Sequence, residues 1–150
     1  MFSFRRANFK DLHDIVRLLA EDELGKERET LTDSTAPSYK KAFEEIQSDP
    51  NQFLMVVENK GEIMGTCHLT FMPSLTYQGS KRMNIEAVRI DQKFQGQGIG
   101  EWMIKEATKL AKEKGCKIIQ LTTNKKRQRA KMFYEKLGFE ATHEGMKLFL

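Results

Sequence analysis

The chain has 150 residues, of which 39% are hydrophobic and 9% aromatic, and this composition predicts one soluble domain spanning residues 1–150. Its formal charge of +4 is too small to indicate nucleic-acid binding by itself, and it would equally suit a polyanionic cofactor. No apolar run approaches the roughly 18 residues of a membrane span, and residues 1–6 contain no apolar signal core. Cys67 and Cys116 fit neither a disulfide framework nor a zinc spacing, so we expect a cytoplasmic protein without a membrane segment.

The first third of the chain predicts a strand followed by two helices. Residues 2–7 include alternating apolar and polar side chains, which is typical of a strand. Asn8 is a plausible cap for a helix whose apolar face comprises Leu12, Ile15, Val16 and Leu19. After an aperiodic, acidic segment over 20–33, a second helix is expected to start near Pro37 or Ser38 and to end at 48–51.

The middle of the chain predicts three strands joined by turns. An apolar, β-branched run over 53–57 and a returning run over 63–71 flank the turn sequence Asn-Lys-Gly-Glu at 59–62. A loop is expected over 72–79 and a third strand over 83–90. Strands joined by hairpins favour an antiparallel arrangement in this part of the sheet.

The last third predicts two helices and three strands. A helix that begins in the glycine-rich stretch is expected to end near Lys114, before Gly115. A strand over 117–123, a helix over 130–137 and two closing strands, at 139–142 and 146–150, are expected to follow. The order β-α-α-β-β-β-α-β-α-β-β predicts an α/β (α+β) fold with a mixed sheet and helices on both faces.

The stretch from Val88 to Trp102 is organised as a strand, a glycine-rich turn and a helix. Residues 95–100 contain three glycines but none of the Ser, Thr, Asp or Asn residues that usually cap a helix. The first turn of a helix has unpaired N–H groups and a positive dipole end, so a diphosphate could serve as the cap. A glycine-rich turn capped by water is the alternative.

The glycine spacing is neither a Walker loop nor a dinucleotide fingerprint. It resembles the coenzyme A loop Q/R-x-x-G-x-G/A of the GNAT acetyltransferase superfamily, with Gln95, Gly98 and Gly100 at the defined positions. A second stretch, Ala130 to Phe139, resembles the family's A-x-x-F-Y-x-x-x-G-F helix and strand. The resemblance implies a GNAT-like fold and an acetyl-CoA-dependent N-acetyltransferase that needs no metal.

The resemblance also implies where the cofactor binds. Amides of the glycine turn would hold the diphosphate, the main chain of Val88 and Ile90 would pair with the pantetheine arm, and a strand amide near Val88 would polarise the carbonyl. The expected cofactor-binding residues are Val88, Arg89, Ile90, Gln95, Gly96, Gln97, Gly98, Ile99, Gly100, Asn124 and Lys131.

Two residues are expected to be catalytic. Tyr134 matches the family tyrosine that protonates the leaving thiolate, although its position also suits a core aromatic residue. Glu86 lies two residues before Val88 and is the expected base, acting on the amine through water. A carboxylate paired with Arg82 or Arg89 is the structural alternative, and His68 on the neighbouring strand is a second candidate base.

The basic residues between 125 and 131 form the densest positive charge, and they suit either cofactor phosphates or a solvated helix start. Many relatives have Asn three residues before the helix alanine, but here Arg127 holds that position and Asn124 comes earlier. A direct transfer of the asparagine role therefore does not follow. Lys131 remains an expected phosphate contact.

The acceptor is expected to be a small-molecule or peptide amine. The acidic segment between the first two helices would attract a cation, although a charged surface loop explains it equally. Two other functions stay open: an acyl-CoA-binding module without turnover, and, less favoured, a nucleic-acid binder that uses the 125–131 cluster. A homodimer is possible, but no residue pattern marks its interface.

Overall fold

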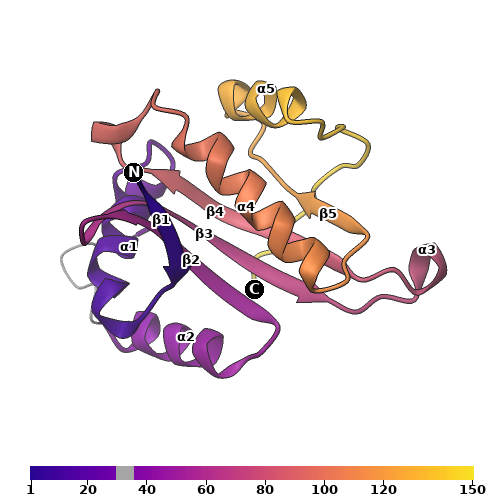
Figure 1. Ribbon diagram of the computed structural model, residues 1–150, viewed down its shortest axis with the longest axis horizontal. Helices are drawn as coiled ribbons and strands as arrows, with labels where there is room; N and C mark the ends of the chain where they lie inside the picture. The colour runs from indigo at the N-terminus through magenta and orange to yellow at the C-terminus, as the bar shows by residue number, and fades with distance from the viewer. Residues whose placement is uncertain (30–35) are drawn as a thin grey trace. The chain divides into compact units, whose positions relative to one another are not determined.

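The computed structural model describes residues 1–29 and 36–150 (Figure 1). The chain divides into two compact units, residues 1–120 and residues 121–150. The last part of the aperiodic segment expected over 20–33 lies outside the described residues. No helix in the described ranges is long and apolar enough to cross a membrane.

Five strands form one sheet in the order β1-β2-β3-β4-β5. The bounds of the strands are Ser3–Arg6 for β1, Gln52–Asn59 for β2, Glu62–Met72 for β3, Arg82–Ile90 for β4 and Ile118–Leu121 for β5. Strands β1 to β4 pair antiparallel with their neighbours. The arrows of β4 and β5 point the same way in Figure 1, so the sheet is mixed, as the element order predicted.

The predicted hairpin between β2 and β3 is confirmed. Asn59 pairs with Glu62, and the two residues between them have positive φ angles, 50° at Lys60 and 85° at Gly61. This is the conformation of a two-residue hairpin turn whose twist matches the flanking strands.

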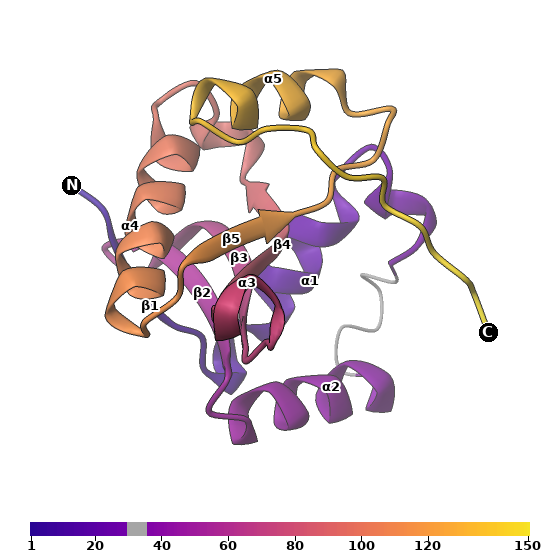
Figure 2. The same ribbon diagram turned by 90° about the vertical axis from the view of Figure 1, so that its right-hand side faces the viewer.

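Helices cover both faces of the sheet (Figure 2). Helix α1 (Leu12–Ala20) and helix α2 (Pro37–Ser48) lie on one face, and α4 (Ile99–Glu113) lies on the other. The buried residues of α1 and α4 recur at helical spacings, which explains why these segments pack as helices. Short turns of 3-10 helix precede α1, follow it at Gly25–Glu27 and precede α4, and the loop after β3 contains the brief helical turn α3 (Thr76–Gly79).

Asn8 caps the 3-10 turn Phe9–Asp11 that leads into α1. Its side chain accepts a hydrogen bond from the amide of Lys10 at 3.0 Å, and its own amide donates to Asp11 Oδ2 at 2.8 Å. Asp11 is buried and is also held by Arg5, whose Nη1 lies 2.7 Å from Oδ2. The predicted cap is therefore confirmed, one turn before the regular helix.

The unit formed by residues 121–150 contains helix α5 (Gln128–Lys136). Gly138 ends this helix region with a φ of 96°, as predicted. The two closing strands predicted at 139–142 and 146–150 are wrong, because residues 139–150 belong to no strand in the described structure. An alternating pattern makes a segment suitable for a sheet, but a strand also needs a neighbour with which to form its hydrogen bonds.

Candidate active site

A bulge in β4 marks the centre of the candidate site. Thr66 on β3 pairs with Arg89, but His68 pairs with Glu86, so two residues of β4 stand opposite the single residue Cys67. One of them, Ala87, has a φ of 53°, which is uncommon for a residue with a side chain. A bulge leaves the extra residue outside the regular ladder and redirects the strand. The other residue opposite Cys67 is Val88, near which the strand amide that would polarise the thioester carbonyl is predicted.

The glycine turn after β4 opens onto the first turn of α4. Gly96 and Gly98 both have a φ of 78°, and Gly98 caps the helix without any side-chain hydrogen bond. No heavy atom outside the turn lies within 4 Å of the place where a Cβ would stand on either glycine. The predicted strand–turn–helix unit is confirmed, and open space beside Gly96 and Gly98 adjoins the positive end of the dipole of a 15-residue helix.

A buried ion pair that the sequence did not reveal anchors this turn. Asp91 is only 3% exposed; its Oδ1 accepts from the amide of Lys93 at 2.9 Å and its Oδ2 from Arg17 Nη1 at 2.9 Å. Burial alone would raise the pKa of Asp91, but these hydrogen bonds and the positive charge of Arg17 hold it below its ordinary value. The carboxylate therefore stays charged and ties α1 to the start of the turn.

His68 and Glu86 face each other across β3 and β4. His68 Nδ1 lies 3.8 Å from Glu86 Oε1, while its Nε2 lies 2.5 Å from Gln52 Oε1, which also accepts from the hydroxyl of Thr70 at 3.0 Å. Since the Gln52 oxygen is an acceptor, it places the ring proton on Nε2 and leaves the lone pair on Nδ1 directed toward Glu86. Burial lowers the pKa of His68 below its ordinary value, against the opposing charge of Glu86.

The arginines considered as alternative partners of Glu86 are engaged elsewhere. Arg82 Nη1 donates to Gln120 Oε1 at 3.2 Å, and its guanidinium lies over the ring of Tyr77. Arg89 Nη2 lies 3.6 Å from Asp22, and its Nη1 donates to the carbonyl of Val88 at 2.8 Å. The partner of Glu86 in the ion pairs of the described residues is His68.

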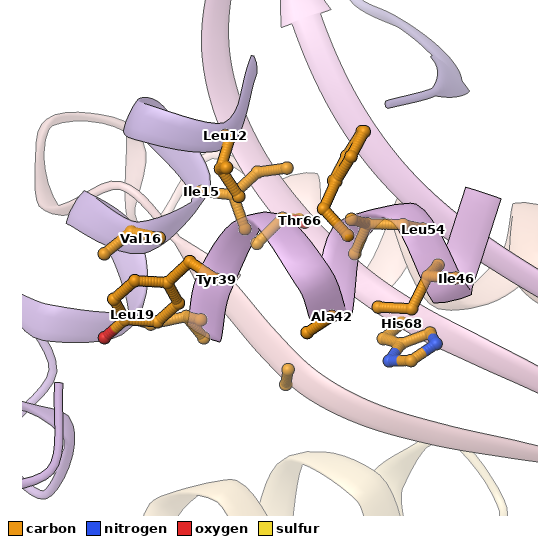
Figure 3. A pocket seen from close by; sticks show the side chains of 12 residues that line it. Leu12, Ile15, Val16, Leu19, Tyr39, Ala42, Ile46, Leu54, Thr66 and His68 are labelled. Carbon is orange, nitrogen blue, oxygen red and sulfur yellow. The ribbon is translucent and has the colours of Figure 1, made fainter. Parts of the chain in front are cut away.

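Two adjoining hollows lie beside this pair, and both are lined by Ala42, Ile46 and His68. The first, with a cavity volume of about 150 Å³, lies between α1 and α2 (Figure 3). Apart from Tyr39, Thr66 and His68 its lining is apolar: Leu12, Ile15, Val16, Leu19, Ala42, Phe43, Ile46, Leu54 and Ala87. The second is lined by acidic and polar side chains that include Glu45, Asp49, Gln52 and Glu86.

The acidic segment that follows α1 is largely neutralised by local contacts. Glu21 pairs with Arg17 at 3.1 Å and Glu23 with Lys26 at 3.1 Å. Asp22 accepts from the amides of Leu24 and Gly25. These contacts support the interpretation of a charged surface segment rather than an acceptor-binding cluster.

The remaining predicted residues lie in the unit 121–150. Asn124 Oδ1 accepts from the amide of Lys126 at 2.9 Å, so it shapes the turn before α5. Lys131 Nζ lies 3.7 Å from Glu135 Oε1, one helical turn on. The ring of Tyr134 packs edge-on against Phe133 and Phe139, with centroids 5.1 and 5.7 Å away. Tyr134 therefore packs against neighbouring aromatic rings, although α5 itself has no fully buried residue.

Residues 12–139 match the profile of the acetyltransferase (GNAT) family. The chain belongs to this family. Membership agrees with the mixed five-stranded sheet and the helix arrangement, and it confirms the fold that the two sequence motifs predicted.

Relatives in sequence and structure agree with the GNAT assignment. A glucosamine 6-phosphate N-acetyltransferase from Trypanosoma brucei brucei is 34% identical over 90 residues, which cover 60% of this chain and 59% of that protein. The chain is also similar to a transcriptional regulator from Bacillus halodurans C-125 whose crystal structure is known. The two sequences are 47% identical, and their structures superpose with a TM-score of 0.97 over 100% of each chain. A predicted acetyltransferase from Clostridium acetobutylicum, solved with acetyl-CoA, is 21% identical and superposes with a TM-score of 0.76 over 99% of this chain and 96% of that one. At this level of identity the similarity supports the shared fold and no more.

Sequence reasoning missed several residues that build the site. Gln52 and Thr70 fix the imidazole of His68, and Arg17 and Asp91 brace the glycine turn. No local sequence pattern links these residues, because Arg17 and Asp91 are 74 positions apart and Gln52 and His68 are 16 apart; only the fold brings them together. Cys67 on β3 is fully buried, and burial raises the pKa of its thiol to about 12.

Proposed function

We propose that this GNAT chain is an N-acetyltransferase that moves the acetyl group of acetyl-CoA to a primary amine within a ternary complex. The observation that carries the proposal is the continuity of the β4 bulge at Ala87–Val88 with the left-handed glycine turn at Gly96 and Gly98. The bulge supplies backbone groups outside the ladder, and the turn supplies helix amides without a side-chain cap.

The glycine turn has the features needed to hold a diphosphate. The space beside Gly96 and Gly98 is open, no side chain caps the first turn of α4, and the positive end of its dipole favours an anion there. The main chain of Val88, Arg89 and Ile90 would extend along the pantetheine arm, and Asn124 and Lys131 are further proposed contacts. Acetyl-CoA, when bound, supplies an activated thioester, and every other step falls to residues of this chain.

Removal of the amine proton falls to Glu86, with His68 as the competing base. The 3.8 Å between Glu86 Oε1 and His68 Nδ1 is too long for a direct hydrogen bond and suits a bridging water. We propose that Glu86 accepts the proton through that water. His68, whose pKa is lowered by burial, is neutral near pH 7 and would orient the water with its Nδ1 lone pair.

Two groups would act on the thioester itself. The amide of Val88 would donate a hydrogen bond to its carbonyl oxygen as negative charge develops there. Tyr134 would protonate the departing thiolate, a role supported by the match of Ala130 to Phe139 to the family motif. The protons balance when the amine arrives as its ammonium: one proton passes through Glu86 to solvent before attack, and the second, lost from nitrogen as the amide forms, restores Tyr134 after it has protonated the sulfur.

The test is an assay of turnover with a panel of primary amines. Its two readouts are the release of the free CoA thiol and the mass of the acetylated product. The proposal predicts product with a mass increase of one acetyl group and equal amounts of free thiol. Acetyl-CoA binding without product from any amine would favour the acyl-CoA-binding module. If acetyl-CoA does not bind and binding to DNA falls steeply with salt, the nucleic-acid function through the 125–131 cluster would replace both.

A further inference from the structure

The two hollows beside His68 differ sharply in chemistry. Side chains of α1 and α2 make the first an apolar slot, while carboxylates of Glu45, Asp49 and Glu86 surround the second. Among the described residues that line them, there is no lysine or arginine. A ligand that fills both would therefore have a cationic end and an apolar body.

The polar groups in the apolar slot offer few hydrogen bonds to a ligand. The hydroxyl of Thr66 is already used, since it donates to the carbonyl of Met55 at 2.7 Å. His68 Nε2 is likewise engaged with Gln52. A sugar hydroxyl buried against Ile15, Val16 or Leu19 would lose its water without gaining a hydrogen-bond partner, which disfavours a sugar in this slot.

A phosphorylated acceptor is disfavoured by the same lining. A phosphate needs Arg, Lys or free amides, whereas the second hollow presents three carboxylates to an entering ligand. This chemistry does not match the substrate named for the trypanosomal relative, glucosamine 6-phosphate. The ammonium form of an amine, in contrast, is attracted to Glu86 and is delivered to the proposed base.

We propose that the acceptor is a primary alkyl or arylalkyl amine, with its apolar body between α1 and α2 and its nitrogen beside Glu86 and His68. This rests on the proposed function, because it assigns the acceptor of that same site. The slot has a cavity volume of about 150 Å³, the size of cavity that admits a benzene-sized apolar group. The nitrogen gives up its proton at Glu86 before it attacks the thioester.

Phenethylamine and glucosamine 6-phosphate are the two probes that test the acceptor class. The proposal predicts a higher kcat/KM with phenethylamine, and perturbation of α1 and α2 signals by phenethylamine in NMR spectra recorded without acetyl-CoA. Preference for glucosamine 6-phosphate would overturn the acceptor class and leave the proposed function intact. Failure of every amine to be acetylated, with acetyl-CoA bound or not, would instead overturn the proposed function.

Matched variants on α2 locate the site. Glu45→Lys places a positive charge in the acidic hollow and should raise KM for phenethylamine about tenfold, while Glu44→Lys, on the neighbouring residue outside both linings, should not. Ala42→Phe fills both hollows and should weaken phenethylamine binding, with Lys41→Phe as its control. If Glu45→Lys and Ala42→Phe leave phenethylamine KM and binding unchanged, the acceptor does not bind between these helices and the proposal fails.

Discussion

His68 Nε2 lies 2.5 Å from Gln52 Oε1, while the opposite ring nitrogen faces Glu86 at 3.8 Å. Gln52 therefore sets the direction of the imidazole, and Thr70 in turn holds the oxygen of Gln52. This arrangement directs the unprotonated nitrogen at the carboxylate that we propose as the base.

Glu86→Gln should lower kcat for acetyl transfer by a factor of about 10² to 10⁴, the usual contribution of a positioned base. The KM for acetyl-CoA should change little, because the proposed cofactor contacts are in the glycine turn and the β4 backbone. Steady-state kinetics with Glu113→Gln, an exposed glutamate at the end of α4, provide the control. A Glu86→Gln enzyme with full activity would transfer the role of base to His68 or to water alone.

The lowered pKa of His68 predicts a loss of stability in mild acid. The imidazole is neutral in the fold, so between its folded pKa and its ordinary value of 6.5 the unfolded chain binds more protons. The free energy of unfolding should therefore fall as the pH drops below 6.5. Chemical denaturation of wild type and His68→Gln between pH 5 and 8 measures the free energy of unfolding at each pH. The variant should lose the part of the pH dependence that comes from His68. Equal slopes would mean that His68 does not titrate abnormally.

Tyr134→Phe should lower kcat by about 10² to 10⁴ if the phenol is the general acid. Affinity for acetyl-CoA should persist, because the ring that packs against Phe133 and Phe139 is retained. Tyr77→Phe is a matched control, since Tyr77 is 66% exposed and belongs to α3. Normal turnover by Tyr134→Phe would leave Tyr134 with a packing role only.

Asp91→Ala should destabilise the protein by about 1–3 kcal/mol, because it removes the acceptor of the Lys93 amide and leaves Arg17 without its buried partner. Asp14→Ala removes the exposed partner of the same arginine, 3.5 Å away, and should cost well under 1 kcal/mol. Urea denaturation compares the two variants. Equal losses would show that the buried pair does not anchor the glycine turn.

The sequence predicted the elements whose signals are local. The helical spacings of α1 and α4, the Lys60–Gly61 turn and the glycines at 96 and 98 each determine a conformation through their own residues. The candidate base and the glycine turn could be located in the same way, with the family motif as support.

The parts that escaped prediction depend on partners far along the chain. The bulge at Ala87 arises from the register between β3 and β4, and the direction of the His68 ring depends on Gln52 from β2. The two hollows need side chains from α1, α2 and the sheet together. The predicted strand at 146–150 failed for the same physical reason, since an alternating sequence does not specify which edge it joins.

Calorimetric titration of acetyl-CoA into wild type and into Gly98→Val tests the central claim most directly. In wild type we expect one site per chain, with ATP as a polyanion that binds much more weakly. Gly98→Val strains a backbone held at a φ of 78° and should abolish binding, whereas Gly115→Val, with a φ of 77° at the far end of α4, should retain it. Equal acetyl-CoA affinity in wild type and Gly98→Val, or no binding at millimolar acetyl-CoA in wild type, would contradict the account.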